Sequence, residues 1–211
     1  MFDEQQGTST RMAPYGDGRT YAIPSGWPET TEAMRATALE ATLAALEPGV
    51  VDRLDRYYDP DGGYSGLLFA TAGDNPAYDV SAADLWAVST LSVQVDSRQA
   101  RRIFDASNAR IVSLLHALPV DTALSDLEHS PLGSAVTLDR MWDLHLLFKT
   151  LTSTDDRDSN RWVFASKLCA RKRPGLFPVR DSLVCQHLAG GQSLVERVPA
   201  TSAPTCRFTR T

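Results

Sequence analysis

Apolar residues recur along this chain at spacings of three and four, which is the period of α-helices with one buried face. Residues 31–46 form the first such segment, and a shorter one follows at 50–58. An apolar run at 85–93 comes next, and longer segments lie at 97–118 and 134–151. No segment alternates between apolar and polar residues for the length of a strand. The pattern predicts an all-α fold.

Residues that favour helix ends divide these segments. The predicted N-caps are Ser81, with Asp84 completing a capping box, then Asp96 or Ser97, and finally Asp158 or Ser159 before a helix that begins near Trp162. Pro174 and Gly175 end that last helix. The chain then starts a further helix at Asp181, so its carboxylate is expected to accept bonds from the free N–H groups of the first turn.

Breaker residues and length set the domain organisation. Residues 1–28 carry repeated Pro and Gly with no sustained period, and they are expected to form an irregular N-terminal arm. Residues 29–188 form the predicted helical domain, because 211 residues fit one domain of ordinary size. Residues 189–211 turn to Gly, Ser, Thr, Pro and Arg, which predicts a loosely ordered tail.

Composition narrows the class of protein. Three dispersed cysteines supply neither a disulfide framework nor a four-thiolate metal site, and no cofactor is predicted. The four histidines show no metal-binding pair at i and i+4, and His145 is expected to be a hydrogen-bonded core residue because it shares a face with Met141 and Phe148. Neither an export signal nor a run of about 20 apolar residues is visible, so a cytoplasmic protein without a membrane partner is expected.

Charge is distributed unevenly along the chain. The formal net charge is −5, but seven basic residues and one acid give residues 157–180 a charge of +6, which leaves −11 for the rest. An acidic body with one basic strip attracts anions to that strip. Solvated helix charges are the alternative interpretation of the same residues.

The loop from Tyr57 to Gly66 combines three tyrosines with two aspartates and several turn-forming residues. Its aromatic rings could contact a ligand. A calcium loop needs further oxygen ligands at alternate positions and a closing glutamate, and both are missing. A structural turn is the competing interpretation.

The order of hairpin, helix, basic turn, Pro178-Val179 link and helix-opening Asp181 resembles the helix-hairpin-helix DNA glycosylase superfamily over about residues 159–188. This resemblance places Asp181 on the catalytic aspartate of that superfamily and implies a glycosylase-like helical fold. The hairpin glycines are replaced by Ser159 and Arg161, and the lysine nucleophile of bifunctional members aligns with Val163. The resemblance therefore implies a monofunctional enzyme and not a lyase acting through that position.

A second resemblance is to an uncharacterised actinobacterial family with a Tyr-Asp-Pro-Asp-Gly-Gly loop. The loop at 58–63 and the motif at 165–174, followed by Pro178-Val179-Arg180-Asp181, carry this similarity. In that family a Gly-Val-Gly hairpin stands before the position of Trp162.

These observations favour a nucleic-acid- or nucleoside-binding protein, with N-glycosidic cleavage by Asp181 as its reaction. The expected ligand-binding residues are Arg161, Trp162, Lys167, Arg171, Lys172, Arg173, Tyr58, Asp61 and Tyr64. Tyr57 and Trp142 are further candidates for an aromatic pocket. Two alternatives remain open: a non-catalytic DNA-binding or regulatory protein, and the same fold used as an enzyme on a small anionic metabolite.

Overall fold

The computed structural model describes residues 11–14, 20–23, 31–105, 108–129, 132–153, 161–181 and 183–185. Helices account for most of these residues, which confirms the helical prediction. They are α1 (Glu32–Ala45), α2 (Val50–Tyr58), α3 (Gly66–Thr71), α4 (Ala82–Ser89), α5 (Ser97–Phe104), α6 (Asn108–His116), the 3₁₀-helix η1 (Leu124–His129), α7 (Ser134–Thr152) and α8 (Trp162–Lys172). The predicted tail at 189–211 lies outside the described residues.

The N-terminal arm differs in part from the irregular chain that we predicted. Strands β1 (Arg11–Pro14) and β2 (Thr20–Ile23) pair antiparallel, with Arg11 opposite Ile23. Each strand has only four residues, which is too short for an alternating pattern to be recognised in the sequence. The rest of residues 1–28 lies outside the described chain.

Two predicted caps are confirmed and one is wrong. Ser81 and Asp84 form a reciprocal capping box at the start of α4, and Asp96 forms another with Gln99 at the start of α5. The N-cap of α8 is Arg161, which makes no side-chain cap bond, instead of Asp158 or Ser159.

The predicted helix at 97–118 is two helices. Helix α5 ends at Phe104, and α6 begins at Asn108. The sequence Asp105-Ala106-Ser107-Asn108 places three residues that compete for backbone hydrogen bonds in the middle of the apolar period, and such residues favour caps and turns.

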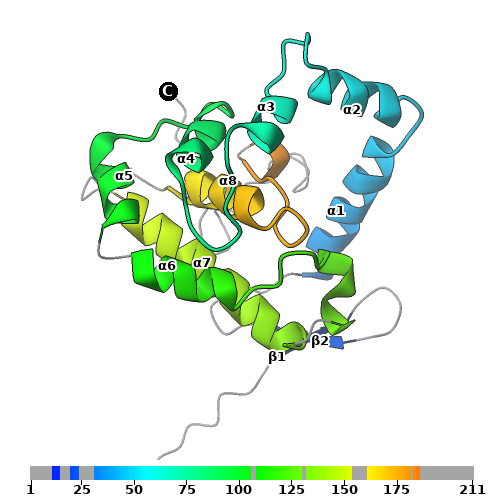
Figure 1. Cartoon of the computed structure of the whole chain (residues 1–211). Coiled ribbons are helices and arrows are strands. Elements are labelled where there is room, and N and C mark those ends of the chain that lie inside the picture. Colours follow the sequence, from blue (N-terminus) through cyan, green and yellow to red (C-terminus); the bar gives the residue numbers. More distant parts are fainter. Residues whose placement is uncertain are drawn as a thin grey trace, which may run out of the picture.

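Helix α8 lies at the centre of the molecule (Figure 1), where it packs against α7 and α4. All of its residues except Val163 are buried. Helices α5 and α6 pack against α7 in turn. The core contains Val88, Ile103, Leu115, Leu144, Phe148, Phe164 and Leu168, each at most 1% exposed. Helices α4 to α8 thus form a packed scaffold around the core.

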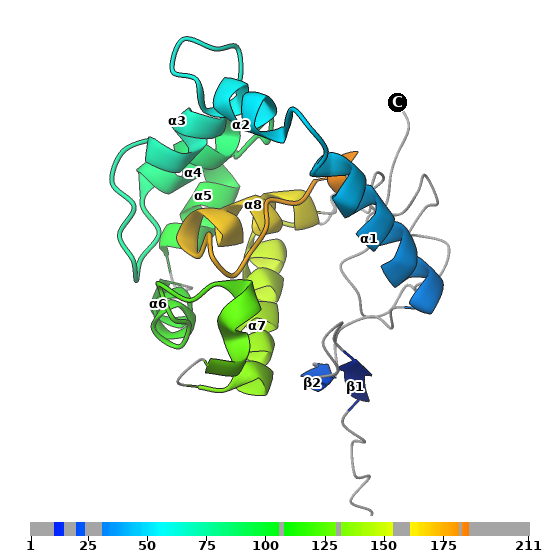
Figure 2. The ribbon, with the colours of Figure 1, turned by 90° about the vertical axis from the view of Figure 1, so that its right-hand side faces the viewer.

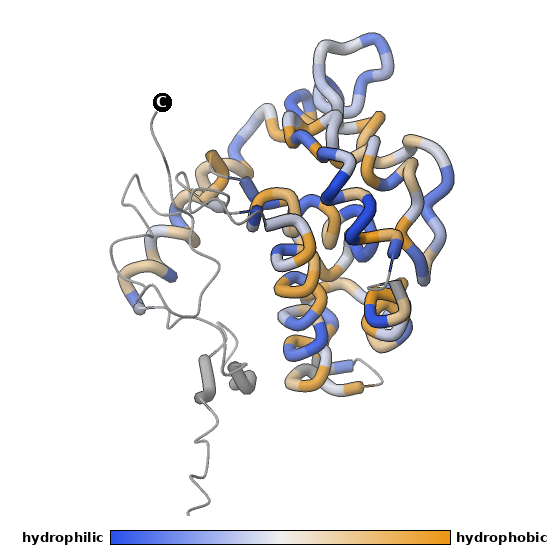
Figure 3. Tube along the Cα trace, turned by 90° about the vertical axis from the view of Figure 1, so that its left-hand side faces the viewer, coloured by the Kyte–Doolittle hydropathy of each residue, from blue (hydrophilic) through white to orange (hydrophobic). Residues whose placement is uncertain are grey.

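Helices α1 and α2 lie at the edge of this scaffold. Neither contains a buried residue. In Figures 2 and 3, helix α1 stands apart from the body formed by α4 to α8. Within that body, hydrophobic and hydrophilic residues alternate over the turns of α7 (Figure 3). Among the described helices, none is both long and apolar enough to cross a membrane.

Candidate functional site at Asp181

The basic end of α8 points into the protein and not towards solvent. Arg171, Lys172 and Arg173 are each at most 3% exposed. The prediction that they form an exposed basic strip is therefore wrong, and so is the alternative of solvated helix charges. We expected these residues to be exposed, because long basic side chains are rarely buried unless they are paired.

A buried carboxylate pairs with two of these cations. Asp84 is 0% exposed, and its Oδ1 atom lies 3.2 Å from Arg171 Nε while its Oδ2 atom lies 2.9 Å from Lys172 Nζ. We call Asp84, Arg171, Lys172 and Arg173 the Asp84 cluster. The capping box of α4 holds Asp84 in place, because the backbone N–H of Ser81 donates to the same carboxylate. The Asp84 cluster thus joins the first turn of α4 to the C-terminal end of α8.

Backbone carbonyls accept the remaining N–H bonds of the Asp84 cluster. Arg171 donates to Phe69, Ala70 and Ala72 at the end of α3, over 2.5–2.7 Å. Lys172 donates to Pro76, and Arg173 donates to Leu115, Leu118 and Ala77. Each side-chain nitrogen of the three cations thus has a partner inside the protein, and several of these partners are carbonyls at the ends of α3 and α6.

Asp181 opens a helical turn at 183–185, as predicted. Its Oδ1 atom accepts a hydrogen bond from the backbone N–H of Val184 at 3.0 Å, and its carbonyl accepts one from Cys185. Its Oδ2 atom lies 3.6 Å from Lys167 Nζ. One hydrogen bond and one ion pair therefore hold the carboxylate, and the Asp181 side chain is still 31% exposed.

Lys167 lies one helical turn before the Asp84 cluster. It is 5% exposed, and its Nζ atom donates to the carbonyl of Leu91 at 2.7 Å. Burial lowers the pKa of Lys167, and the charge of Asp181 opposes this shift. Of the four predicted phosphate-binding residues on α8 and at its end, Lys167 is the one that meets the candidate acid.

Ser166 and Arg180 form a second contact beside the first. Arg180 Nη2 lies 3.4 Å from Ser166 Oγ, and this hydroxyl also lies 3.1 Å from His145 Nε2. Two successive residues of α8 therefore meet two successive residues of the following link. We call His145, Ser166, Lys167, Arg180 and Asp181 the Asp181 cluster.

His145 occupies the buried side of the Asp181 cluster. It is 4% exposed and hydrogen-bonded, so the prediction of a core histidine is confirmed. Burial, together with the positive charges of Arg180 and Lys149, lowers its pKa to about 4, against a hydrogen bond to the Trp162 backbone that raises it. The ring is therefore neutral at pH 7.

Tyr57 lies within reach of the charge of Asp181 and packs against two further tyrosines. The ring centroid of Tyr57 is 5.0 Å from that of Tyr58 and 6.2 Å from that of Tyr64, and we call these residues the tyrosine group. Burial raises the pKa of Tyr57, as do the nearby Tyr58 and the charge of Asp181. Tyr58 and Tyr64 are 47% and 62% exposed. The half-buried Tyr57 thus links the charge of Asp181 to two exposed aromatic rings.

Gly66 allows the tyrosine group to approach the start of α3. A Cβ atom at Gly66 would lie 2.2 Å from Tyr57 Cε1 and 2.6 Å from the Tyr57 carbonyl oxygen. Real side chains do not reach such distances, so only glycine fits without movement of Tyr57. Asp61 lies on the exposed part of the same loop, where its N–H donates to Asp59 Oδ1 in a local turn.

Arg161 and Trp162 lie at the other end of α8. Trp162 is 3% exposed and packs against Cys185, so its ring is not presented to a ligand. Arg161 Nη1 lies 3.5 Å from the carbonyl of Gln94, in the loop between α4 and α5. The hairpin residues Ser159 and Asn160 fall outside the described residues.

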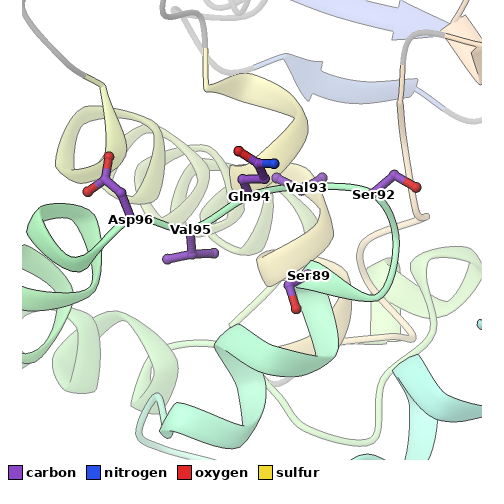
Figure 4. Close-up of a pocket in the computed structure, with 6 residues that line it drawn as sticks. All are labelled: Ser89, Ser92, Val93, Gln94, Val95 and Asp96. Carbon is purple, nitrogen blue, oxygen red and sulfur yellow. The ribbon is translucent and has the colours of Figure 1, made fainter.

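That loop borders an open hollow of about 630 Å³ (Figure 4). Its lining residues are Ser89, Ser92, Val93, Gln94, Val95 and Asp96. Gln94 and Val95 point to opposite sides of the loop in Figure 4. Asp96 is already used to cap α5, so it is not a free acid. Among the described residues, no three His, Cys, Asp or Glu side chains gather as a metal site requires.

Sequence reasoning found Asp181 but missed most of its neighbours. Ser166, Arg180 and His145 come from three separate segments, and no spacing in the sequence relates them. The motif Pro178-Val179-Arg180-Asp181 drew attention to Arg180 and Asp181, but it did not indicate their contacts with Ser166 and Lys167. Lys167 was predicted as a phosphate contact, whereas the structure pairs it with the acid.

Comparison with known proteins gives one result. The model of a family of unknown function (DUF6308) matches residues 50–203, well over half of the chain, so the chain belongs to this family. The matched range contains the Asp84 cluster, the Asp181 cluster and the tyrosine group, whereas α1 precedes it. No curated protein and no solved structure matches the chain.

Proposed function

We propose that this member of the family of unknown function binds nucleosides or nucleic-acid bases at Asp181 and hydrolyses the N-glycosidic bond. One observation carries the proposal: the Asp181 carboxylate accepts a hydrogen bond from Val184 N–H, pairs with Lys167, has a 31% exposed side chain, and, in addition to burial, raises the pKa of Tyr57, whose ring adjoins those of Tyr58 and Tyr64. Aromatic rings favour stacked bases, and a fixed carboxylate favours the positive charge of an oxocarbenium-like transition state.

The reaction follows from these roles. The bond between the sugar carbon and the base nitrogen breaks, and its electrons leave with the base. Asp181 stabilises the positive charge that develops on the sugar and orients a water molecule. The water oxygen bonds to the sugar carbon, one of the water protons passes to solvent through Asp181, and the leaving base takes up a proton from solvent. Lys167 and Val184 position the carboxylate and take no part in bond exchange.

The buried Asp84 cluster favours a small ligand over a long polymer. Affinity for DNA depends on several exposed cations that neutralise phosphates. Three of the predicted cations are saturated by internal partners, and Lys167 is 6% exposed in its side chain. We therefore propose nucleosides, nucleotides and unpaired bases as the first ligands, ahead of duplex DNA.

Base release tests the proposal. The wild-type chain is incubated with nucleosides, mononucleotides and single- and double-stranded oligodeoxynucleotides, and the free base is measured by chromatography. Asp181→Asn keeps the size of the side chain and is expected to reduce release on the order of 10²- to 10³-fold. Asp143→Asn, on the exposed surface of α7, is the matched control. Equal release by Asp181→Asn would refute the catalytic role.

A non-catalytic binding protein is the second candidate. It is favoured because both oxygens of Asp181 already have partners, Val184 N–H on one and Lys167 on the other. Binding of bases without release by the wild type would support it. A salt series then separates ligands, because binding to a polymer weakens steeply with salt and binding to a single nucleoside does not.

A further inference from the structure

Arg180 differs from the three cations of the Asp84 cluster. Arg171, Lys172 and Arg173 each donate at least three hydrogen bonds inside the protein. A guanidinium has five N–H donors, but the contact that we find for Arg180 is one of 3.4 Å to Ser166 Oγ. Within the described part of the chain, no carboxylate pairs with Arg180. Arg180 is only partly exposed, and the contact with Ser166 places its guanidinium beside α8.

We propose that Arg180 binds an anionic group of the ligand, a phosphate or a carboxylate, next to the Asp181 carboxylate. The planar fork of arginine matches both groups with two parallel N–H bonds. The position of this anionic group relative to the base and the sugar rests on the proposed function. The binding of an anion by Arg180 rests on the unused donors alone, and the two parts are tested separately below.

The charges of the Asp181 cluster define the ligand class. Lys167 is neutralised by Asp181, while Arg180 carries the unpaired positive charge one residue before it. A ligand anion placed on Asp181 would be repelled, whereas an anion on Arg180 is attracted, and partial burial strengthens this attraction. The site therefore selects a ligand with an anion at one end and a neutral or cationic group at the other. A nucleoside monophosphate has this distribution, and a nucleoside lacks the anion.

His145 provides a readout that does not depend on catalysis. The groups that face its ring are Ser166, Arg180, Lys149, the backbone of Trp162 and the indole of Trp142, whose ring centroid lies 6.4 Å away. The charge of Arg180 lowers the pKa of His145. An anion on Arg180 offsets that charge, so binding is expected to raise the pKa of His145.

Nuclear magnetic resonance of the full chain tests this inference. The His145 ring signals, assigned with His145→Gln, are followed across a pH series with inorganic phosphate, a nucleoside 5′-monophosphate, the matching nucleoside or a short oligonucleotide. Phosphate and the monophosphate are expected to bind and to raise the His145 pKa, and the nucleoside is expected to leave it unchanged. Binding of the oligonucleotide alone would place the anion in a polymer backbone and overturn the mononucleotide class.

Variants of Arg180 decide whether this residue is responsible. Arg180→Gln is expected to weaken phosphate binding at least tenfold and to abolish the shift at His145. Arg180→Lys keeps the charge without the fork and should restore part of the binding. Arg140→Gln, an exposed arginine on α7, controls for general charge and should change neither. Equal phosphate affinity in folded Arg180→Gln and wild type would refute the inference.

Failure of this inference can be told apart from failure of the proposed function. Base release that depends on Asp181 but has the same KM for monophosphates in Arg180→Gln would remove the anion subsite and leave the reaction standing. Anion binding that depends on Arg180, with no base release by the wild type, would keep the subsite and remove the reaction.

Discussion

Two groups of charged residues that adjoin α8 have opposite characters. In the Asp84 cluster, each cation is saturated by a carboxylate or by backbone carbonyls, and no charged atom is left for a ligand. In the Asp181 cluster, Asp181 is 31% exposed and Arg180 has unused donors. The first arrangement joins helices, and the second leaves groups available for chemistry.

The comparison shows that basic composition does not locate a binding surface. Residues 157–180 form one basic strip in the sequence, but burial divides those that the structure describes, 161–180, into a structural part and an open part. Breaking a saturated charge network leaves uncompensated charges in the interior, whereas changing an open charge costs little stability. Stability and ligand binding should therefore respond to different residues.

The largest expected effect comes from removing the carboxylate of the Asp84 cluster. Asp84→Ala leaves Arg171 and Lys172 buried without their counter-charge, and we expect it to reduce the free energy of unfolding by about 3–5 kcal/mol. Urea denaturation measures this loss. Asp143→Ala removes an exposed pair with Arg140 and should change stability by at most about 0.5 kcal/mol. A loss below about 1 kcal/mol for Asp84→Ala would refute the structural role of the cluster.

The same reasoning changes the meaning of arginine variants. Arg171→Ala and Arg173→Ala would be the natural tests of a basic DNA-binding strip. Because both side chains are buried, a loss of binding in these variants would report unfolding. Arg180 is the residue whose substitution tests binding.

The next effect is a dependence of stability on pH, set by His145 in the Asp181 cluster. Its pKa is about 4 in the folded chain and near the ordinary 6.5 in the unfolded chain. Between these values the unfolded chain binds more protons, so stability is full above pH 6.5 and falls as the pH is lowered towards 4, by about 3 kcal/mol in all. Urea denaturation of wild type and His145→Gln over this range measures the difference.

The outcome of this prediction depends on the His145 ring. His145→Gln should flatten the slope of stability against pH between 4 and 6.5. An unchanged slope in His145→Gln would show that the buried ring does not couple protonation to folding.

Elements with a local signal in the sequence were predicted, and elements without one were missed. Long periodic segments such as α7, and capping boxes such as that of Ser81, are local signals, so they were predicted correctly. Helices α3 and η1 were missed because six residues are too few to show a period. Such local signals can be recognised without knowing which segment a helix packs against.

The candidate site was only partly predictable for a related reason. Asp181 was found because it caps a helix, which is a local role. Its contact with Lys167, and that of Arg180 with Ser166, depend on how the link folds back along α8. The inward direction of Arg171 and Arg173 depends on partners in α3, α4 and α6, which are between about 50 and 100 residues away in the chain.

The smallest expected effect concerns the tyrosine group beside the Asp181 cluster. In Gly66→Ala the new Cβ atom would meet Tyr57 Cε1 at 2.2 Å, so Tyr57 or the start of α3 must move. We expect a loss of about 1–3 kcal/mol in the free energy of unfolding. Gly63→Ala is a matched control in the same loop, because its Cβ atom would have no neighbour within 4 Å and should change stability by at most about 0.5 kcal/mol.

The pair of glycine variants also sharpens the comparison between the two clusters. If the tyrosine group belongs to the open site, the displacement of Tyr57 in Gly66→Ala should weaken binding of a base-containing ligand, while the pH dependence set by His145 stays unchanged. Calorimetry with the nucleoside monophosphate and urea denaturation across pH measure the two responses. Equal ligand affinity in Gly66→Ala and Gly63→Ala would remove the tyrosines from the site and leave Asp181 and Arg180 as its binding groups.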